Sequence, residues 1–240
     1  MDLGDDRATS GRLRRWTARP VVRDSLGVAL ATGAYGTSFG AVALAGGLDV
    51  WQAMGLSLLM FSGGSQFGLV GVIAGGGSPW SGVATAVLLG ARNAFYGLRL
   101  SRVLELRGWR RALAAQVVID ESSAMSMARA DRSEERTGFY VTGVGVYLLW
   151  NLGTLVGALG ASALSDPRVL GLDAAAPAAF VALLGPRLRD RSTWAVALAG
   201  AALAVATTPV LPPGLPVLVA GLFALVVGLW PRRGGGEATR

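Results

Sequence analysis

The sequence predicts an all-α fold, that of a polytopic membrane protein with about seven membrane segments. Hydrophobic residues make up 52% of the 240 residues, and several apolar segments of about 20 residues follow one another. The alternating segments of about ten residues that are typical of a transmembrane β-barrel do not occur. At least one helix is expected to be broken or re-entrant, because adjacent glycines and polar side chains interrupt its apolar run.

The charged residues lie mainly between the apolar segments. The formal net charge is +7, and all 22 basic residues are arginines. This distribution follows the positive-inside rule, so it indicates a cytoplasmic membrane face and no nucleic-acid site. The predicted organisation is an arginine-rich cytoplasmic tail over residues 1–24, a single transmembrane transport domain over 25–230 and a C-terminal tail over 231–240.

Cysteine and histidine are both absent from the chain. Their absence excludes disulfides and thiolate sites, and it removes the commonest metal ligand and the usual proton switch near neutral pH. An aspartyl hydrolase within the membrane would need two aspartates that face each other, and Asp120 has no obvious second aspartate inside an apolar segment. We therefore expect no metal, no cofactor and no enzymatic activity.

The first apolar segment, Ser25–Gly46, contains the run Gly36-Thr37-Ser38-Phe39-Gly40. This run matches GxSxG, but a nucleophile elbow needs a strand–turn–helix context and a histidine. It also matches GxxxG, a motif that lets membrane helices approach closely. The sequence favours the packing interpretation.

The second apolar segment, Met54–Gly77, contains the clearest irregularity in the chain. Its centre, Phe61–Phe67, holds two adjacent glycines, two serines and a glutamine, which make a poor continuous helix. Discontinuous helices of this kind form the midplane substrate sites of many transporters. The alternative is close helix packing through small residues.

Three charged residues lie well inside the next two segments, away from their ends. Arg92, in the segment Trp80–Leu98, either snorkels to the interface or lies inside the bundle, where it can bind a carboxylate. Asp120 and Glu121 lie in the middle of Ala112–Ala130, which is too polar to face lipid. Either acid can carry a proton if it is buried, whereas a wet interfacial helix would leave both as ordinary surface residues.

The charges leave the membrane topology open. With the N-terminus and the basic link Arg99–Arg111 both cytoplasmic, an even number of crossings must separate them, yet three apolar segments do. Either the broken segment is a re-entrant pair of half-helices, or the basic link faces outward. The remaining expected segments are Gly138–Leu164, Ala174–Pro186, Thr193–Thr208 and a last one that ends at Trp230.

Five short stretches occur in a specific order along the chain. They are SGGSQF from Ser62, ARNAFYGLRL from Ala91, IDESSAM from Ile119, WNLGTLVGALG from Trp150 and LDAAAPAAFVALLGP from Leu172. Together they resemble the AzlC-type (BrnF-like) large subunit of branched-chain amino-acid exporters, over roughly residues 26–206. The residues that match the family pattern are Gln66, Arg92, Tyr96, Asp120 and Glu121, and those that depart from it are Gly90, for an asparagine, and Asn93, for a histidine.

The resemblance implies a transporter subunit in the bacterial cytoplasmic (inner) membrane. It would export leucine, isoleucine, valine and also methionine, together with a small AzlD-type membrane subunit. Because the chain has no P-loop, the expected energy source is the proton-motive force. The alternative is a non-transporting assembly or regulatory subunit.

Residue types and the resemblance together give two sets of candidate site residues. The proton-coupling candidates are Asp120 and Glu121. The substrate-binding candidates are Ser62, Gly63, Gly64, Ser65, Gln66, Arg92, Asn93, Tyr96, Trp150 and Asn151.

Overall fold

A computed structural model describes residues 20–163, 181, 184–185, 188–212 and 214–229. Over these residues the regular secondary structure is helical throughout, as the sequence predicts. The helices are α2 (Pro20–Ala45), α3 (Val50–Leu59), α4 (Gly64–Ala74), α5 (Pro79–Leu104), α6 (Gly108–Gln116), α7 (Asp120–Met127), α8 (Arg132–Ser162), α10 (Arg191–Thr207) and α11 (Leu215–Leu229). Most of the predicted segment Ala174–Pro186 lies outside the described residues.

Two of the described helices, α2 and α8, are long and apolar enough to cross a membrane. The helices α3, α4, α10 and α11 are apolar but shorter, with 10–17 residues each. The number of membrane segments therefore stays a prediction, while the all-α class is confirmed.

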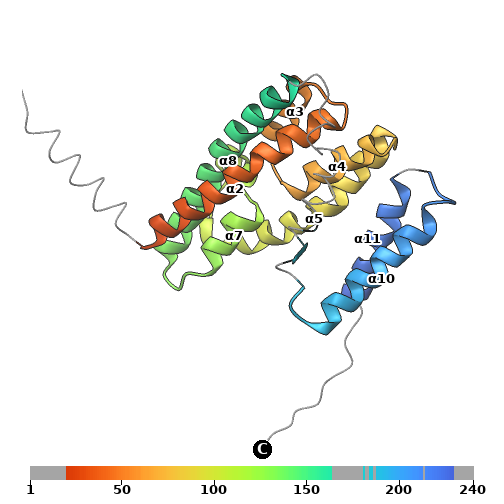
Figure 1. Ribbon diagram of the computed structural model, residues 1–240. Helices are drawn as coiled ribbons and strands as arrows, with labels where there is room; N and C mark the ends of the chain where they lie inside the picture. The colour runs from red at the N-terminus through yellow and green to blue at the C-terminus, as the bar shows by residue number, and fades with distance from the viewer. Residues whose placement is uncertain (1–19, 164–180, 182–183, 186–187, 213, 230–240) are drawn as a thin grey trace, which may run out of the picture.

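Helices α2 and α8 run side by side in the same direction (Figure 1). Glycines allow their backbones to touch: a Cβ atom on Gly36 would lie 2.7 Å from the carbonyl oxygen of Trp150, and one on Gly157 would overlap the carbonyl of Thr37. Gly40 likewise faces the backbone of Thr154. Two GxxxG runs, Gly36–Gly40 in α2 and Gly153–Gly157 in α8, therefore act as packing surfaces, as the sequence favours for the first of them.

One end of the bundle carries most of the charge, and we call it the basic end. The N-termini of α2 and α8 lie here beside the C-terminus of α5. Arg132 Nη2 donates to the Arg102 carbonyl oxygen at 2.7 Å, and the side chain of Arg129 pairs with Asp24 at 2.8 Å. Arg136 Nε donates to the Val103 carbonyl oxygen at 2.9 Å. These contacts tie the three helix ends and the end of α7 together.

The predicted break in the second apolar segment is present, between α3 and α4 at residues 60–63. Helix α3 starts soon after α2 ends, with a reciprocal cap between Asp49 and Gln52. Helix α4 runs antiparallel to α5, since Gly68 faces Leu89 and Gly82 faces Leu69. Both outer ends of the α3–α4 hairpin therefore lie away from the basic end, and its turn reaches toward the middle of the bundle. The α3–α4 hairpin thus begins and ends on the same side of the bundle.

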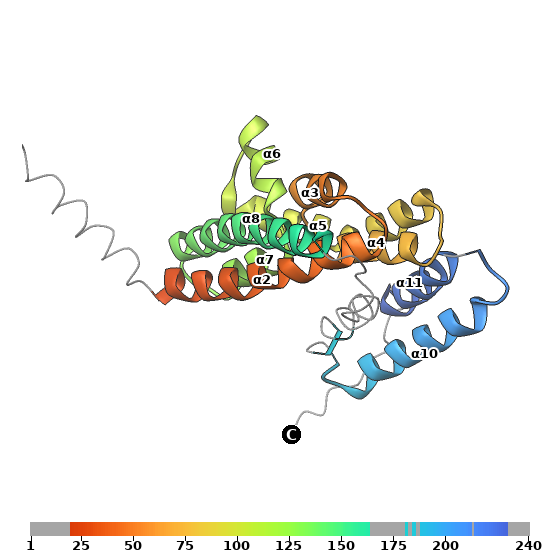
Figure 2. The same ribbon diagram turned by 45° about the horizontal axis from the view of Figure 1, so that its top comes forward.

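A second interrupted hairpin, α6–α7, replaces the single helix expected over Ala112–Ala130. Three residues separate the end of α5, at the basic end, from the start of α6, and Arg129, just beyond α7, returns to that end. The turn at residues 117–119 separates the two helices, so Asp120 opens α7 instead of lying in mid-helix. Figure 2 shows α6 standing out from the bundle while α7 lies along it.

Helices α10 and α11 pack against each other, and α11 also packs against α5 (Figure 1). Gly214 and Gly221 provide the contact, because Cβ atoms there would lie 2.8 Å from Ser81 and 2.6 Å from Leu88. Helix α11 thus runs in the same direction as α5.

Candidate functional site

The turn of the α3–α4 hairpin is built on a glycine conformation. Gly63 has φ 53° and ψ −88°, which a residue with a side chain rarely adopts. Gln66, which is fully buried, holds this turn, because its Oε1 accepts a hydrogen bond from the Gly63 N–H at 3.1 Å. The first turn of α4, Gly64–Gln66, leads from this bend, and the N–H groups of a first turn have no partner within their own helix.

The last carbonyls of α3 are satisfied by residues from other helices. Gln116 Nε2 donates to the Leu58 oxygen at 2.8 Å and to the Leu59 oxygen at 3.3 Å, and the Tyr147 hydroxyl donates to Leu58 at 3.2 Å. Gln116 ends α6, so this contact links the end of α3 to the turn of the other hairpin.

The turn of the α6–α7 hairpin is held by one hydroxyl group. Ser122 Oγ donates to the Val117 carbonyl at 2.6 Å and accepts from the Ile119 N–H at 3.1 Å. Ser122 is fully buried, and the three turn residues, Val117–Ile119, are apolar and buried. The hydroxyl therefore fixes the direction in which Asp120 leaves the turn.

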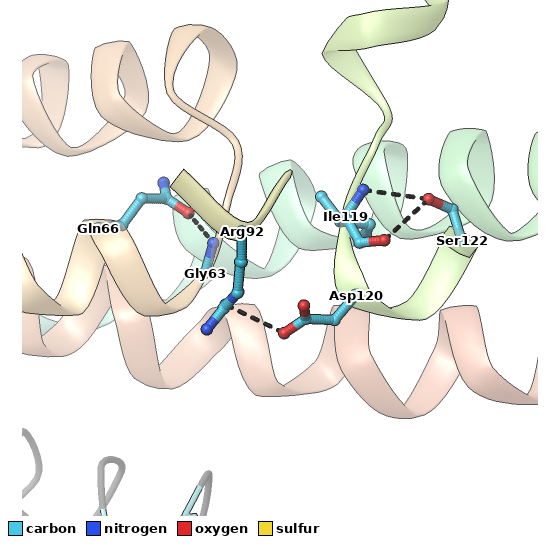
Figure 3. A network of polar contacts seen from close by, with 6 residues as sticks. All are labelled: Gly63, Gln66, Arg92, Ile119, Asp120 and Ser122. Carbon is cyan, nitrogen blue, oxygen red and sulfur yellow. Dashed lines mark hydrogen bonds and ion pairs between the residues drawn. The ribbon is translucent and has the colours of Figure 1, made fainter. Parts of the chain in front are cut away.

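The two turns meet at an ion pair. Arg92 Nη2 lies 3.0 Å from Asp120 Oδ2, and Figure 3 shows the guanidinium between the Gly63 turn and the start of α7. Their side chains are 31% and 23% exposed. A Cβ atom on Gly64 would lie 3.3 Å from Arg92 Nη2, so the guanidinium also lies against the start of α4. Arg92 is twelve residues from the end of α5, and its guanidinium is directed to Asp120 in the middle of the bundle.

A cavity of about 50 Å³ lies beside this pair. Three aromatic rings from three helices form one wall, with the ring of Tyr35 5.6 Å from that of Phe67 and 6.0 Å from that of Trp150. Helices α4 and α7 both direct their N-termini toward it. Its lining residues are Thr32, Tyr35, Phe61, Ser62, Gly63, Gly64, Phe67, Arg92, Ile119, Asp120, Glu121, Val146 and Trp150.

The sequence is similar to those of known membrane proteins. A family model described as AzlC protein matches residues 27–164, more than half of the chain. This chain belongs to the AzlC family. An uncharacterized membrane protein of Archaeoglobus fulgidus is 32% identical over 171 residues, which cover 70% of this chain and 74% of that protein. The inner membrane protein YgaZ of Escherichia coli K12 is 28% identical over 193 residues, with 76% and 79% covered. No solved structure matches.

Seven of the twelve candidate site residues of this AzlC chain line the cavity. They are Ser62, Gly63, Gly64, Arg92, Trp150, Asp120 and Glu121. The fold thus brings together candidate residues from four separate regions of the sequence. Their roles in substrate binding and proton coupling are proposals.

The other five candidates lie outside that lining. Gln66 supports the Gly63 turn, and Ser65 faces Gly90 on α5. Asn151 Nδ2 donates to the Tyr147 carbonyl one turn earlier in α8, at 2.7 Å. Tyr96 packs against an apolar cluster around Leu100, and Asn93 lines a second, larger cavity that is described below.

Sequence reasoning missed six residues that line the cavity. They are Thr32, Tyr35, Phe61, Phe67, Ile119 and Val146. A tyrosine in the middle of an apolar segment is a usable signal, because its hydroxyl needs a polar environment. The other five residues are ordinary for a membrane helix, so only the fold can place them.

Proposed function

We propose that this chain is the large subunit of a secondary transporter that exports branched-chain amino acids. The substrates would be leucine, isoleucine and valine, with methionine as a further one. Export would require a small AzlD-type membrane subunit and would be driven by the proton-motive force. The observation that carries the proposal is the Arg92–Asp120 pair, held between the turns of two interrupted hairpins.

A zwitterionic amino acid offers both partners that this pair needs. Its carboxylate can replace Asp120 on the Arg92 guanidinium and can also accept from the N–H groups that open α4. Its ammonium group can replace Arg92 at Asp120. An apolar side chain fits the aromatic wall of Tyr35, Phe67 and Trp150. Substrate therefore binds by opening an existing ion pair and satisfying both charges.

Protonation of Asp120 opens the same pair by a different route. A neutral carboxyl group no longer attracts the guanidinium, so proton binding and substrate binding act on one contact. Glu121 follows Asp120 in the first turn of α7 and also lines the cavity. The two acids together form the proposed proton-coupling pair.

The proposed membrane arrangement follows from the two hairpins. Helices α3–α4 and α6–α7 would enter from opposite faces as re-entrant pairs, with the basic end in the cytoplasm of the inner membrane. The proposal keeps about seven membrane segments, a cytoplasmic N-terminal tail over residues 1–24, a transport domain over 25–230 and a C-terminal tail over 231–240.

The test of export uses cells loaded with leucine and isoleucine. We expect efflux when the chain is co-expressed with its small AzlD-type partner and none from the chain alone. Equal efflux in the two cases would contradict the need for a partner. A lack of efflux in both cases, with the two proteins present in the membrane, would favour an assembly or regulatory role.

The test of proton coupling compares two assays on the same variants. Asp120→Asn with Glu121→Gln is expected to abolish efflux driven by a pH gradient while exchange of leucine at equilibrium continues. Glu134→Gln, in the first turn of α8, is the control and is expected to leave both assays unchanged. Uphill export by the double variant with an unchanged pH profile would exclude this pair as the proton carrier.

A further inference from the structure

While the ion pair is closed, the cavity beside it is too small to hold the proposed substrate. Its volume of about 50 Å³ holds a few water molecules, since one water needs roughly 10–15 Å³. Pockets that bind small organic molecules have volumes of roughly 300–1,000 Å³. An amino acid therefore needs another space within the protein before it reaches Arg92 and Asp120.

A second cavity has the required size. Its volume is about 330 Å³, and it lies between the second half of α5, helix α6 and the end of α3. Leu100, Leu104 and Val118 give it apolar walls. Because α5 ends and α6 begins at the basic end, this cavity lies on the basic-end side of the ion pair.

Four polar side chains line the larger cavity, and two of them, Ser101 and Gln116, donate to main-chain carbonyl oxygens. Asn93 Oδ1 is buried and has no hydrogen-bond partner among the described residues, so it is free to accept a bond from a ligand. Arg111 forms no ion pair within that same set of residues and can receive a carboxylate. An acceptor, a cation and apolar walls are the features that an apolar amino acid requires.

Phe61 lines both cavities. It is 4% exposed, and its ring meets that of Tyr147 edge-on, with the centroids 4.9 Å apart. Phe61 lies in the break between α3 and α4, where no helical hydrogen bonds hold the backbone in a regular helix. Its side chain therefore lies between the two cavities, on a residue outside any regular helix.

We propose that the 330 Å³ cavity is an access site for zwitterionic amino acids with apolar side chains, and that Phe61 separates it from the Arg92–Asp120 pair. This inference rests on the proposed transport function. The carboxylate binds Arg111, the ammonium group donates to Asn93 Oδ1, and the side chain lies against the leucines of α5. Movement of Phe61 then admits the amino acid to the space beside the ion pair.

The direct test measures occupancy without transport. The chain has no cysteine, so Gly97→Cys places a single thiol in the larger cavity, where a Cβ atom would meet nothing within 4 Å. Gly160→Cys is the matched control, since it is also in open space on a helix but lines neither cavity. Excess leucine is expected to slow thiol labelling of Gly97→Cys several-fold, and excess lysine is not.

Two outcomes of this labelling test overturn the access site. Leucine could leave the labelling rate of Gly97→Cys unchanged, or it could slow Gly160→Cys to the same extent, which would indicate a global change. The labelling uses the full chain co-expressed with its small partner. If the unmodified chain exports leucine in that setting, either outcome removes the access site and leaves the proposed function intact.

Blocking variants test whether transport uses the cavity. Gly97→Leu fills the space and is expected to lower leucine efflux at least tenfold, while Gly160→Leu keeps normal efflux. Phe61→Ala is expected to raise exchange of leucine relative to uphill export, and Phe61→Leu, which retains an apolar side chain, is expected to keep most of the coupling. Normal efflux by Gly97→Leu would contradict passage through the cavity.

Discussion

The turns of the α3–α4 and α6–α7 hairpins both lie beside the Arg92–Asp120 ion pair, but different interactions stabilise them. In α3–α4 the turn depends on backbone freedom, because Gly63 adopts a conformation that side chains disfavour. In α6–α7 the turn consists of buried β-branched residues and depends on the Ser122 hydroxyl. The α3–α4 turn is therefore expected to tolerate little change in its backbone conformation, whereas the α6–α7 turn is expected to tolerate little change in the Ser122 side chain.

The hairpins also differ in the charge that they bring to the site. Helix α7 begins with Asp120 and Glu121, so its positive N-terminal end already has carboxylates beside it. Helix α4 has no acidic residue in its first turn. Of the two helix N-termini at the cavity, that of α4 is therefore the one open to an external carboxylate, while α7 supplies negative charge.

The largest effect is expected when the link between the hairpins is broken at Arg92. Arg92→Met should lower leucine efflux on the order of 30-fold or more, given roughly 2 kcal/mol for a hydrogen bond to a charged group. Arg92→Lys should keep part of the activity, because lysine retains the charge but not the planar geometry. The control is Arg99→Met, since Arg99 pairs with Glu135 at 3.5 Å and is half exposed. Normal efflux by Arg92→Met, at normal membrane levels, would rule out a role for its charge.

A smaller effect is expected at the glycine turn. Gly63→Ala should destabilise the protein by about 2–3 kcal/mol through the backbone alone, because the nearest side-chain atom, in Trp150, would be 3.8 Å from the new Cβ. Gly55→Ala in α3 is the control; it meets nothing within 4 Å and should stabilise its helix by up to about 1 kcal/mol. Thermal unfolding in detergent measures both, and equal midpoints for the two variants would show that the turn carries no strain.

Loss of the Ser122 hydroxyl is expected to destabilise the turn at residues 117–119. Ser122→Ala removes the partner of the Val117 carbonyl and the Ile119 N–H, which should cost about 1–2 kcal/mol. Ser123→Ala is the neighbouring control, because Ser123 is equally buried but its Oγ has no hydrogen-bond partner among the described residues. If both variants unfold at the same temperature, the hydroxyl of Ser122 does not hold the turn.

The smallest effect is expected at the basic end, where α6–α7 begins. The hydrogen bond and positive charge of Arg132, with a smaller contribution from Arg136, hold the pKa of Glu105 below its ordinary value of 4.5. The contribution to stability is therefore present above pH 4.5 and is lost as the pH falls through the lower folded-state pKa. Glu105→Gln should lower the unfolding temperature slightly at neutral pH and not at strongly acidic pH. A decrease of equal size at both pH values would exclude the ion pair as its cause.

The sequence predicts one hairpin better than the other for a physical reason. Adjacent glycines at 63 and 64 weaken a helix wherever they occur, so the α3–α4 break is visible locally. The α6–α7 turn has no glycine or proline at residues 117–119. Its signals are a β-branched run, which lowers helix propensity, followed by two acids suited to a helix N-terminus, and both are weak.

The ion pair between Arg92 and Asp120 could not be predicted from the sequence. Arg92 and Asp120 are each recognisable as unusual charges, yet their pairing depends on how far two separate hairpins reach into the bundle. The aromatic wall is similar, because Tyr35, Phe67 and Trp150 come from three helices, α2, α4 and α8, that only long-range packing brings together. Residue types give the chemistry of the site, and long-range packing decides which residues share it.

The close packing of α2 on α8 has a consequence for how the chain is made. Helix α8 emerges from the ribosome about a hundred residues after α2, a delay of roughly 5–20 s at ordinary rates of synthesis. During that time the glycine face of α2 has no partner whose backbone can come as close as that of α8 does. Helix α2 must therefore remain without this partner until α8 has been synthesised, and helices α3 to α7 are all made before the pair can close.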